Sequence, residues 1–143
     1  MNARPDLAAL GAASPIQLSV IIPFLNEREV LPACCARLRR VLRTLGLSYE
    51  IVFVDDGSSD GSAEYLLALL REERGIKLVR LSRNFGKEAA MTAGLEHAAG
   101  AAVIMLDADL QDPPEVIPDM VRAWREGADV VSMRRRSRAG ESA

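Results

Sequence analysis

From Leu18 onward, short runs of β-branched and other apolar residues alternate with longer stretches of helical spacing, and this alternation limits the possible folds most. The apolar runs predict strands at 18–23, 50–55, 76–81, 102–106 and 129–131. The stretches between them predict helices that begin at Pro32 and end at Gly46, follow N-cap candidates 58–60, and span 86–99 and 114–126. Strands and helices in this order form parallel β-α-β units with right-handed crossovers. The sequence therefore predicts an α/β layered fold with a mainly parallel sheet.

Composition and charge place the chain among ordinary globular proteins and away from nucleic-acid binders. The chain has 143 residues, 49% of them hydrophobic and 27% charged, which suits one domain with a buried core. Its net charge is −2, and the last ten residues carry four Arg and one Glu, a net of +3. An acidic body of this kind lacks the basic face that a nucleic-acid partner requires.

The N-terminal residues and the cysteines bear on where the protein works. Residues 1–17 are predicted to be a flexible leader before a domain over 18–143, since they have no signal-peptide pattern. No run approaches the roughly 20 apolar residues of a membrane helix. Cys34 and Cys35 are adjacent, which fits neither a disulfide framework nor a metal knuckle, so they are predicted to be buried thiols in a reducing compartment. We therefore expect a cytoplasmic protein without a transmembrane segment.

Polar residues follow four successive predicted strands, at the edge where ligands bind in such sheets. The segments are Asn26-Glu27, Asp55-Asp56-Gly57, Arg83 to Lys87, and Asp107 to Asp112. For Asp55 and Asp56 taken alone, turn formation is the better interpretation, because Asp-Gly-Ser is common turn chemistry. Arg83 is equally well explained as a surface charge, whereas Lys87 lies near a helix start that favours anions, so phosphate contact is plausible there. His97 is more simply a packed or exposed helix residue than a catalytic one.

The segment after the fourth strand carries the stronger signal. Asp107 and Asp109 repel each other unless a cation or hydrogen-bond donors compensate their charges. With Gln111 and Asp112 they offer oxygen ligands of the kind that Mg²⁺ or Mn²⁺ prefers, and diphosphate is the usual partner anion of such an ion. We favour a metal site in this segment over a solvated acidic loop.

Four motifs in order give the chain a specific family resemblance. They are LSVIIPFLNE from Leu18, VDDGSSDG from Val54, SRNFGKE from Ser82 and LDADLQDPPE from Leu106. Together they resemble family 2 glycosyltransferases of the GT-A fold. The last two motifs, and the segment from Val130 to Ser142, are similar to the polyprenyl-phosphate branch, which includes dolichol-phosphate mannose synthases and bactoprenol glucosyltransferases. The resemblance implies a Rossmann-like three-layer sandwich.

The resemblance also implies an activity and residue roles. The implied reaction transfers a sugar from a UDP- or GDP-sugar to undecaprenyl or dolichyl phosphate, with inversion, at the cytoplasmic face of a membrane. Nucleotide-binding positions are Pro23, Asn26, Glu27, Asp55, Asp56, Lys87 and Asp107. Mg²⁺ or Mn²⁺ would be held by Asp107, Asp109 and Gln111, and the implied catalytic residues are Asp107, Asp109 and Arg135, the last facing phosphate.

The chain departs from the family in two respects. Leu25 stands where the family often has an aromatic residue, and members of this branch are considerably longer than 143 residues. We therefore expect a domain shortened at its C-terminus, with a non-catalytic nucleotide-sugar-binding module as the alternative function. A receiver or phosphatase domain is disfavoured, because its acidic motif would follow a different strand or be followed by Thr or Val rather than Gln111.

Overall fold

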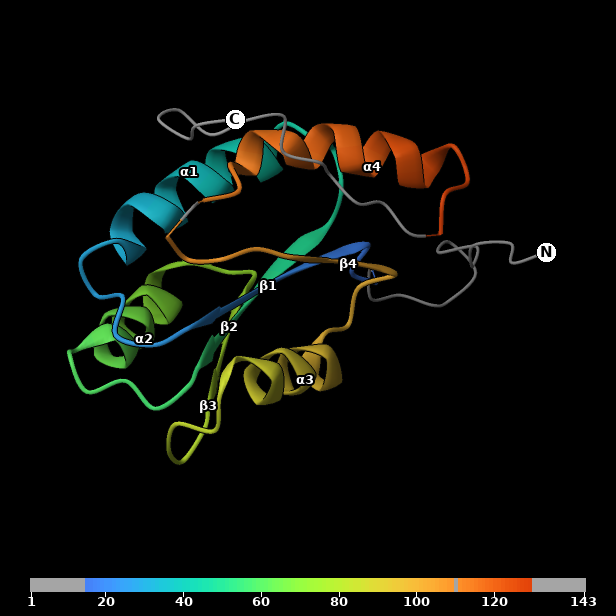
Figure 1. The fold of residues 1–143 in the computed structure, drawn as a ribbon. Helices are drawn as coiled ribbons and strands as arrows, with labels where there is room; N and C mark the ends of the chain where they lie inside the picture. Colours follow the sequence, from blue (N-terminus) through green and yellow to red (C-terminus); the bar gives the residue numbers. More distant parts are fainter. Residues whose placement is uncertain (1–14, 110, 130–143) are drawn as a thin grey trace, which may run out of the picture.

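A computed structural model gives the structure of residues 15–109 and 111–129, which form a parallel four-stranded sheet covered by helices (Figure 1). The strands lie in the order β3-β2-β1-β4 and all pair in parallel. Along the chain the elements are β1 (Leu18–Phe24), α1 (Leu31–Arg43), β2 (Tyr49–Asp55), α2 (Ser62–Glu72), β3 (Ile76–Arg80), α3 (Lys87–His97), β4 (Ala102–Met105), the 3₁₀ helix η2 (Pro114–Val116) and α4 (Ile117–Arg125). The parallel α/β prediction is confirmed.

The sheet is the middle of three layers, and its central strands are therefore buried on both faces. In β1, Val20, Ile22 and Phe24 pack with α1, α2 and α4, whereas Ile21 faces α3. Figure 1 shows α1 and α4 on one side of the sheet and α3 on the other. Strands buried on both faces read as continuous apolar runs, which is why β1 and β2 could be recognised in the sequence.

Small residues bring α3 close to the sheet. Ala90 and Gly94 are its buried residues, and a Cβ atom added to Gly94 would lie only 2.4 Å from Cγ2 of Ile21 on β1. Any larger residue at this position requires the buried Ile21 side chain to shift or the helix to move away from the sheet. The small-residue helix predicted between strands three and four therefore serves close helix–sheet packing.

Two helices start differently from their predictions. Residues 58–60 were expected to cap the second helix, but α2 begins at Ser62 with Gly61 as its N-cap, and Ser58 bonds the β1–α1 loop instead. Asp60 bonds both segments: its Oδ1 accepts from the N–H of Ser62 at the start of α2, and its Oδ2 accepts from the Arg28 N–H in the β1–α1 loop. The helix predicted over 114–126 is divided into η2 and α4. Pro118 has no N–H to donate to the carbonyl of Pro114, so the hydrogen bond that a continuous α-helix would make at this turn is missing.

Several boundaries also shift by a few residues. The helix expected to end at Gly46 ends at Arg43, and 44–46 form a turn whose Gly46 has φ of +66°. Residues 130 and 131 of the predicted fifth strand lie outside the described residues. Residues 1–14 of the expected leader also lie outside the described residues. Gln17, the last residue of that leader, forms hydrogen bonds with Ser48 at the start of the sheet.

A buried carboxylate joins the sheet to the α3–β4 connection at the amino ends of the strands. Glu50 on β2 accepts hydrogen bonds from the Ser19 hydroxyl and the Ala99 N–H, both at 2.6 Å, and pairs with the Lys77 ammonium at 2.7 Å. Burial alone would raise the pKa of Glu50, but the hydrogen bonds from Ala99, Lys77 and Ser19 together lower it below its ordinary value. This network fixes the entry into β4 and hence the position of the residues that follow it.

Cys34 and Cys35 on α1 are buried free thiols, as the sequence predicts. Burial raises the pKa of Cys34 to about 12 and that of Cys35 to about 11. In the described part of the chain, no helix combines the length and apolar character needed to cross a membrane.

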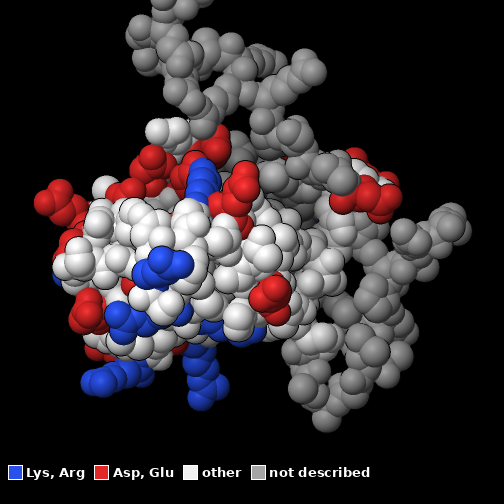
Figure 2. All heavy atoms as spheres, turned by 60° about the horizontal axis from the view of Figure 1, so that its bottom comes forward, with Lys and Arg blue, Asp and Glu red and all other residues white. Residues whose placement is uncertain are grey.

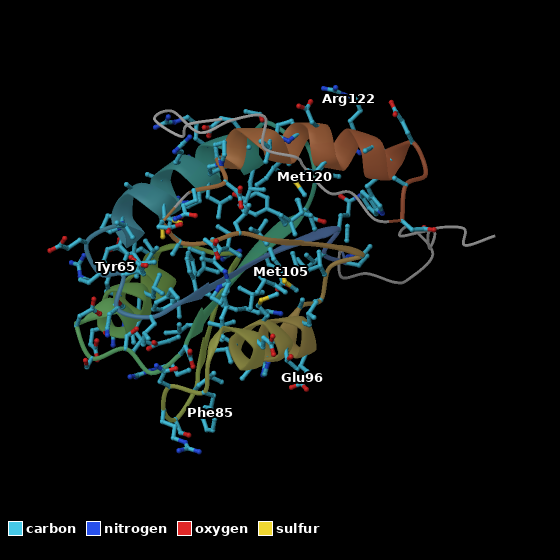
Figure 3. All side chains as sticks on the ribbon, viewed as in Figure 1. Tyr65, Phe85, Glu96, Met105, Met120 and Arg122 are labelled. Atoms are coloured by element: carbon cyan, nitrogen blue, oxygen red, sulfur yellow. The ribbon has the colours of Figure 1, made fainter. Side chains whose placement is uncertain are left out.

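The close approach of α3 to β1 can be tested with Gly94→Ala. We expect this change to lower the free energy of unfolding by about 1–3 kcal/mol, because the clash with Ile21 outweighs the better helix propensity of alanine. Urea unfolding measures the effect. Glu96→Ala, on the outward side of the same helix (Figure 3), serves as control and should change stability by no more than about 0.5 kcal/mol. Equal stability of the two variants would contradict the packing described here.

Candidate functional site

The carboxyl ends of the four strands open into one cleft of about 510 Å³. This volume suits a small ligand such as a nucleotide. Seven of the residues predicted from the sequence line the cleft: Pro23, Glu27, Asp56, Lys87, Asp107, Asp109 and Gln111. Leu25, Asn84 and Gly86 line it too. The structure thus brings together residues from the loops after all four strands.

Asn26 and Asp55 are not among the lining residues, and Arg135 lies outside the described residues. Asn26 adopts a positive φ of +53°, which asparagine tolerates better than most residues. Its N–H donates to Ser58 Oγ at 2.8 Å, and its Oδ1 accepts from the Ser59 N–H at 2.8 Å. Asn26 therefore joins the β1–α1 and β2–α2 loops, while its predicted contact with a nucleotide stays a prediction.

The two adjacent aspartates at the end of β2 have different surroundings. Asp55 is buried, accepts from the Ser58 N–H at 2.7 Å and lies 3.9 Å from the Arg80 guanidinium. Asp56 is also buried but lines the cleft, and its two oxygens accept from the backbone N–H groups of Phe85 and Gly86. Asp55 thus closes its own turn, whereas Asp56 holds the β3–α3 loop in place.

Gly57 extends this contact between the β2–α2 and β3–α3 loops. It has φ of +92°, and a Cβ atom there would lie 2.6 Å from the backbone nitrogen of Asn84. The two loops therefore touch through their backbones. Phe85, in the β3–α3 loop, points outward from the molecule (Figure 3), with the Arg83 guanidinium 4.6 Å from its ring centre. Sequence reasoning did not identify Gly57 or Asn84 as site residues, although the Asp-Gly pair signals a tight turn.

An ion pair crosses the cleft from α3 to the segment after β4. Lys87 is the first residue of α3, and its Nζ lies 2.7 Å from Oδ1 of Asp107. Both side chains keep contact with solvent, with 63% of Lys87 and 34% of Asp107 exposed. Figure 2 shows basic and acidic side chains interspersed on the face that carries α3, rather than a surface of one sign.

Glu27, another acidic group of the cleft, lies close enough to neighbouring carboxylates for their charges to affect its pKa. Burial raises the pKa of Glu27, and the negative charges of Asp109 and Asp60 raise it further. Asp109 is exposed and accepts a hydrogen bond from the Gln111 N–H at 3.2 Å. This side of the cleft therefore favours a bound cation.

The oxygen donors fit a divalent ion that takes part of its coordination from a ligand. Asp107, Asp109 and Gln111 line the same cleft and offer carboxylate and amide oxygens, which Mg²⁺ and Mn²⁺ prefer. Within residues 15–109 and 111–129, no three His, Cys, Asp or Glu side chains are grouped to enclose a metal ion by themselves. Mg²⁺ in nucleotide sites is commonly held by one or two carboxylates together with phosphate oxygens, so this donor set fits that kind of site.

Comparison with known proteins assigns the family. The family model described as glycosyl transferase family 2 matches residues 19–143. This chain belongs to glycosyl transferase family 2. The family resemblance inferred from the four motifs is thereby confirmed.

Curated relatives of this family 2 chain include two with substantial identity. An uncharacterized glycosyltransferase of Synechocystis sp. is 52% identical over 127 residues, which cover 89% of this chain and 40% of that protein. The undecaprenyl-phosphate 4-deoxy-4-formamido-L-arabinose transferase of Salmonella paratyphi B is 45% identical over 128 residues, covering 88% of this chain and 39% of that protein. The chain thus spans about two fifths of the length of these relatives.

Solved glycosyltransferase structures confirm the GT-A fold. A mannosyltransferase from Pyrobaculum calidifontis, in complex with GDP-Man and Mn²⁺, is 24% identical with a TM-score of 0.63 over 76% of this chain and 33% of that chain. S. aureus TarS 1–349 in complex with UDP-GlcNAc is 25% identical with a TM-score of 0.59 over 78% of this chain and 32% of that chain. The family 2 chain therefore shares its α/β layers with proteins solved in complex with GDP-Man and with UDP-GlcNAc.

The contact between the β2–α2 and β3–α3 loops can be isolated with a matched pair of glycines. Gly57 and Gly61 both have φ of +92°, but a Cβ atom at Gly61 meets nothing within 4 Å. We expect both Gly→Ala variants to lose about 1–2 kcal/mol of unfolding free energy from backbone strain. Gly57→Ala should lose about a further 1–3 kcal/mol from the clash with Asn84. Urea unfolding of both variants measures the difference, and equal losses would show that the loops do not depend on this contact.

Proposed function

We propose that this chain is the donor-binding part of a glycosyltransferase that moves a sugar from a UDP- or GDP-sugar to a polyprenyl phosphate. The observation that carries the proposal is the cleft, which Asp107, Asp109 and Gln111 line together with Lys87. Oxygen ligands for a divalent ion and a lysine for phosphate are the groups that a nucleoside diphosphate requires. Family membership supports this assignment.

Each side of the cleft has its own role in this proposal. The nucleoside would contact residues at or just after the ends of β1 and β2: Pro23, Asn26, Glu27, Asp55 and Asp56. Asp107, Asp109 and Gln111 would hold Mg²⁺ or Mn²⁺ at the diphosphate, with Lys87 as a further cationic contact. Arg135, outside the described residues, would face the acceptor phosphate.

The acceptor assignment rests on relatives and on chemistry. By its name, the Salmonella relative acts on undecaprenyl phosphate. A phosphate acceptor is already ionised near neutral pH, so its oxygen attacks without a strong general base, and a cleft built from acidic and amide side chains is sufficient. A lipid-linked acceptor would bring the reaction to a membrane surface, which for this branch is the cytoplasmic face.

The proposed reaction is a single displacement. An acceptor phosphate oxygen forms a bond to the anomeric carbon from the face opposite the diphosphate, which leaves with the electron pair of the broken C–O bond and inverts the configuration. A bound divalent ion would supply charge neutralisation for the leaving diphosphate. Lys87 and the N-terminus of α3 add positive charge on the same side.

A second candidate is a module that binds the nucleotide sugar without transferring it. The described residues that line the cleft all come from the segment 23–111, and the proposed donor binding draws on these residues. A radiolabelled-sugar assay with polyprenyl phosphate separates the candidates, because only the enzyme moves the label to the lipid.

Donor binding itself can be tested by calorimetry with UDP and GDP in the presence and absence of Mn²⁺. We expect one of the two nucleotides to bind, and to bind at least about tenfold more tightly with Mn²⁺. Asp109→Asn should reduce that gain, because it removes a negative ligand from the metal. Asp119→Asn on α4, whose ion pair with Arg122 is exposed, is the control and should bind as the parent chain does. Absence of binding by either nucleotide with Mn²⁺ would refute the donor site.

A further inference from the structure

The Lys87–Asp107 ion pair places a lysine on the carboxylate that the proposed function assigns to the metal. Lys87 Nζ lies 2.7 Å from Asp107 Oδ1, a normal distance for a charge-assisted hydrogen bond. The two residues come from different segments, the start of α3 and the segment after β4. Their side chains meet inside the cleft, because both are lining residues.

The lysine backbone has little freedom to withdraw from this position. Gly86, directly before Lys87, donates its N–H to Asp56, and Phe85 donates to the same carboxylate. Asp56 is only 5% exposed, so these hydrogen bonds are shielded from water. A change of partner would therefore take place by rotation of the four-carbon side chain of Lys87, with its Cα still beside the cleft.

A divalent ion and the Lys87 ammonium would compete for the Asp107 carboxylate. An ion bound to Oδ1 would displace the ammonium from its hydrogen bond and would repel it across a few ångströms. The lysine thus weakens metal binding whenever it has no other anion to contact. A diphosphate in the cleft offers such an anion, beside the N-terminus of α3, whose N-cap Gly86 supplies no side-chain cap.

We propose that Lys87 is a positioning residue that makes the binding of metal and of nucleoside diphosphate depend on each other. This proposal rests on the proposed function, and it describes an exchange of contacts. Lys87 moves from the Asp107 carboxylate to a diphosphate oxygen, and Asp107 becomes available to the metal in the same event. The site then binds Mn²⁺ poorly by itself and well together with a nucleotide.

The test compares Mn²⁺ binding to the 143-residue chain with Mn²⁺ binding to Lys87→Met. Electron paramagnetic resonance of free Mn²⁺ and calorimetry both measure the affinity. Without nucleotide, Lys87→Met should bind Mn²⁺ about 3- to 10-fold more tightly, since it loses a competing cation. With UDP or GDP present, the same variant should gain less affinity for Mn²⁺ than the parent chain gains. The mutual enhancement therefore falls by at least about fivefold.

Three further variants separate this effect from a general loss of charge. Lys87→Arg keeps the cation and should behave nearly as the parent chain does. Arg122→Met removes an exposed basic partner of Asp119 on the outward side of α4 (Figure 3) and should leave Mn²⁺ binding unchanged. In an Asp107→Asn background, replacing Lys87 with Met should no longer tighten Mn²⁺ binding, which completes a double-mutant cycle.

The outcomes distinguish this proposal from the proposed function. If the parent chain binds a nucleotide with Mn²⁺ but Lys87→Met shows the same Mn²⁺ affinity and the same mutual enhancement, the exchange is wrong and the donor site stands. An equal tightening in Arg122→Met would also overturn the exchange, because overall charge would then explain it. If no variant binds UDP or GDP with Mn²⁺, the donor site itself is wrong.

Discussion

Burial of β1 and β2 on both faces is the constraint on which the rest of this structure depends. Their side chains are packed between α3 on one side and α1, α2 and α4 on the other, so neither strand has a surface for polar residues. Backbone groups find partners in neighbouring parallel strands, and polar side chains are confined to the strand ends. A cleft at the carboxyl edge follows directly, since the four strands run the same way and their loops meet there.

The loops at this edge are held by one another. Asn26 connects the first loop to the second, Asp56 and Gly57 connect the second to the third, and Lys87 connects α3 to the segment after β4. Most of these connections use backbone N–H groups, which cannot rotate away as side chains can. The cleft is therefore largely preformed, and the Lys87–Asp107 pair is the connection best able to change when a ligand arrives.

The sequence predicts the elements well where one physical signal dominates, as in the apolar runs of β1 and β2. It also predicts the shared edge, because parallel strands must end together. It cannot separate Asp55 from Asp56, since neighbouring residues at a strand end point in opposite directions and only the three-dimensional loop decides which faces the cleft. Nor does spacing reveal that Lys87 meets Asp107, because their contact depends on how the α3–β4 unit folds back. Ser58 and Asp60 show the same limit: both look like helix caps, but Ser58 bonds the β1–α1 loop instead, and Asp60 divides its carboxylate between that loop and the first N–H of α2.

The adjacent buried thiols on α1 make local unfolding of the core measurable. With pKa values of about 12 and about 11, Cys34 and Cys35 carry almost no thiolate at neutral pH while the core is closed. Alkylating reagents react with thiolate, so they reach these side chains at an appreciable rate only after α1 leaves the sheet. Their labelling rate therefore reports how often the layer that carries the β1–α1 loop separates from the core.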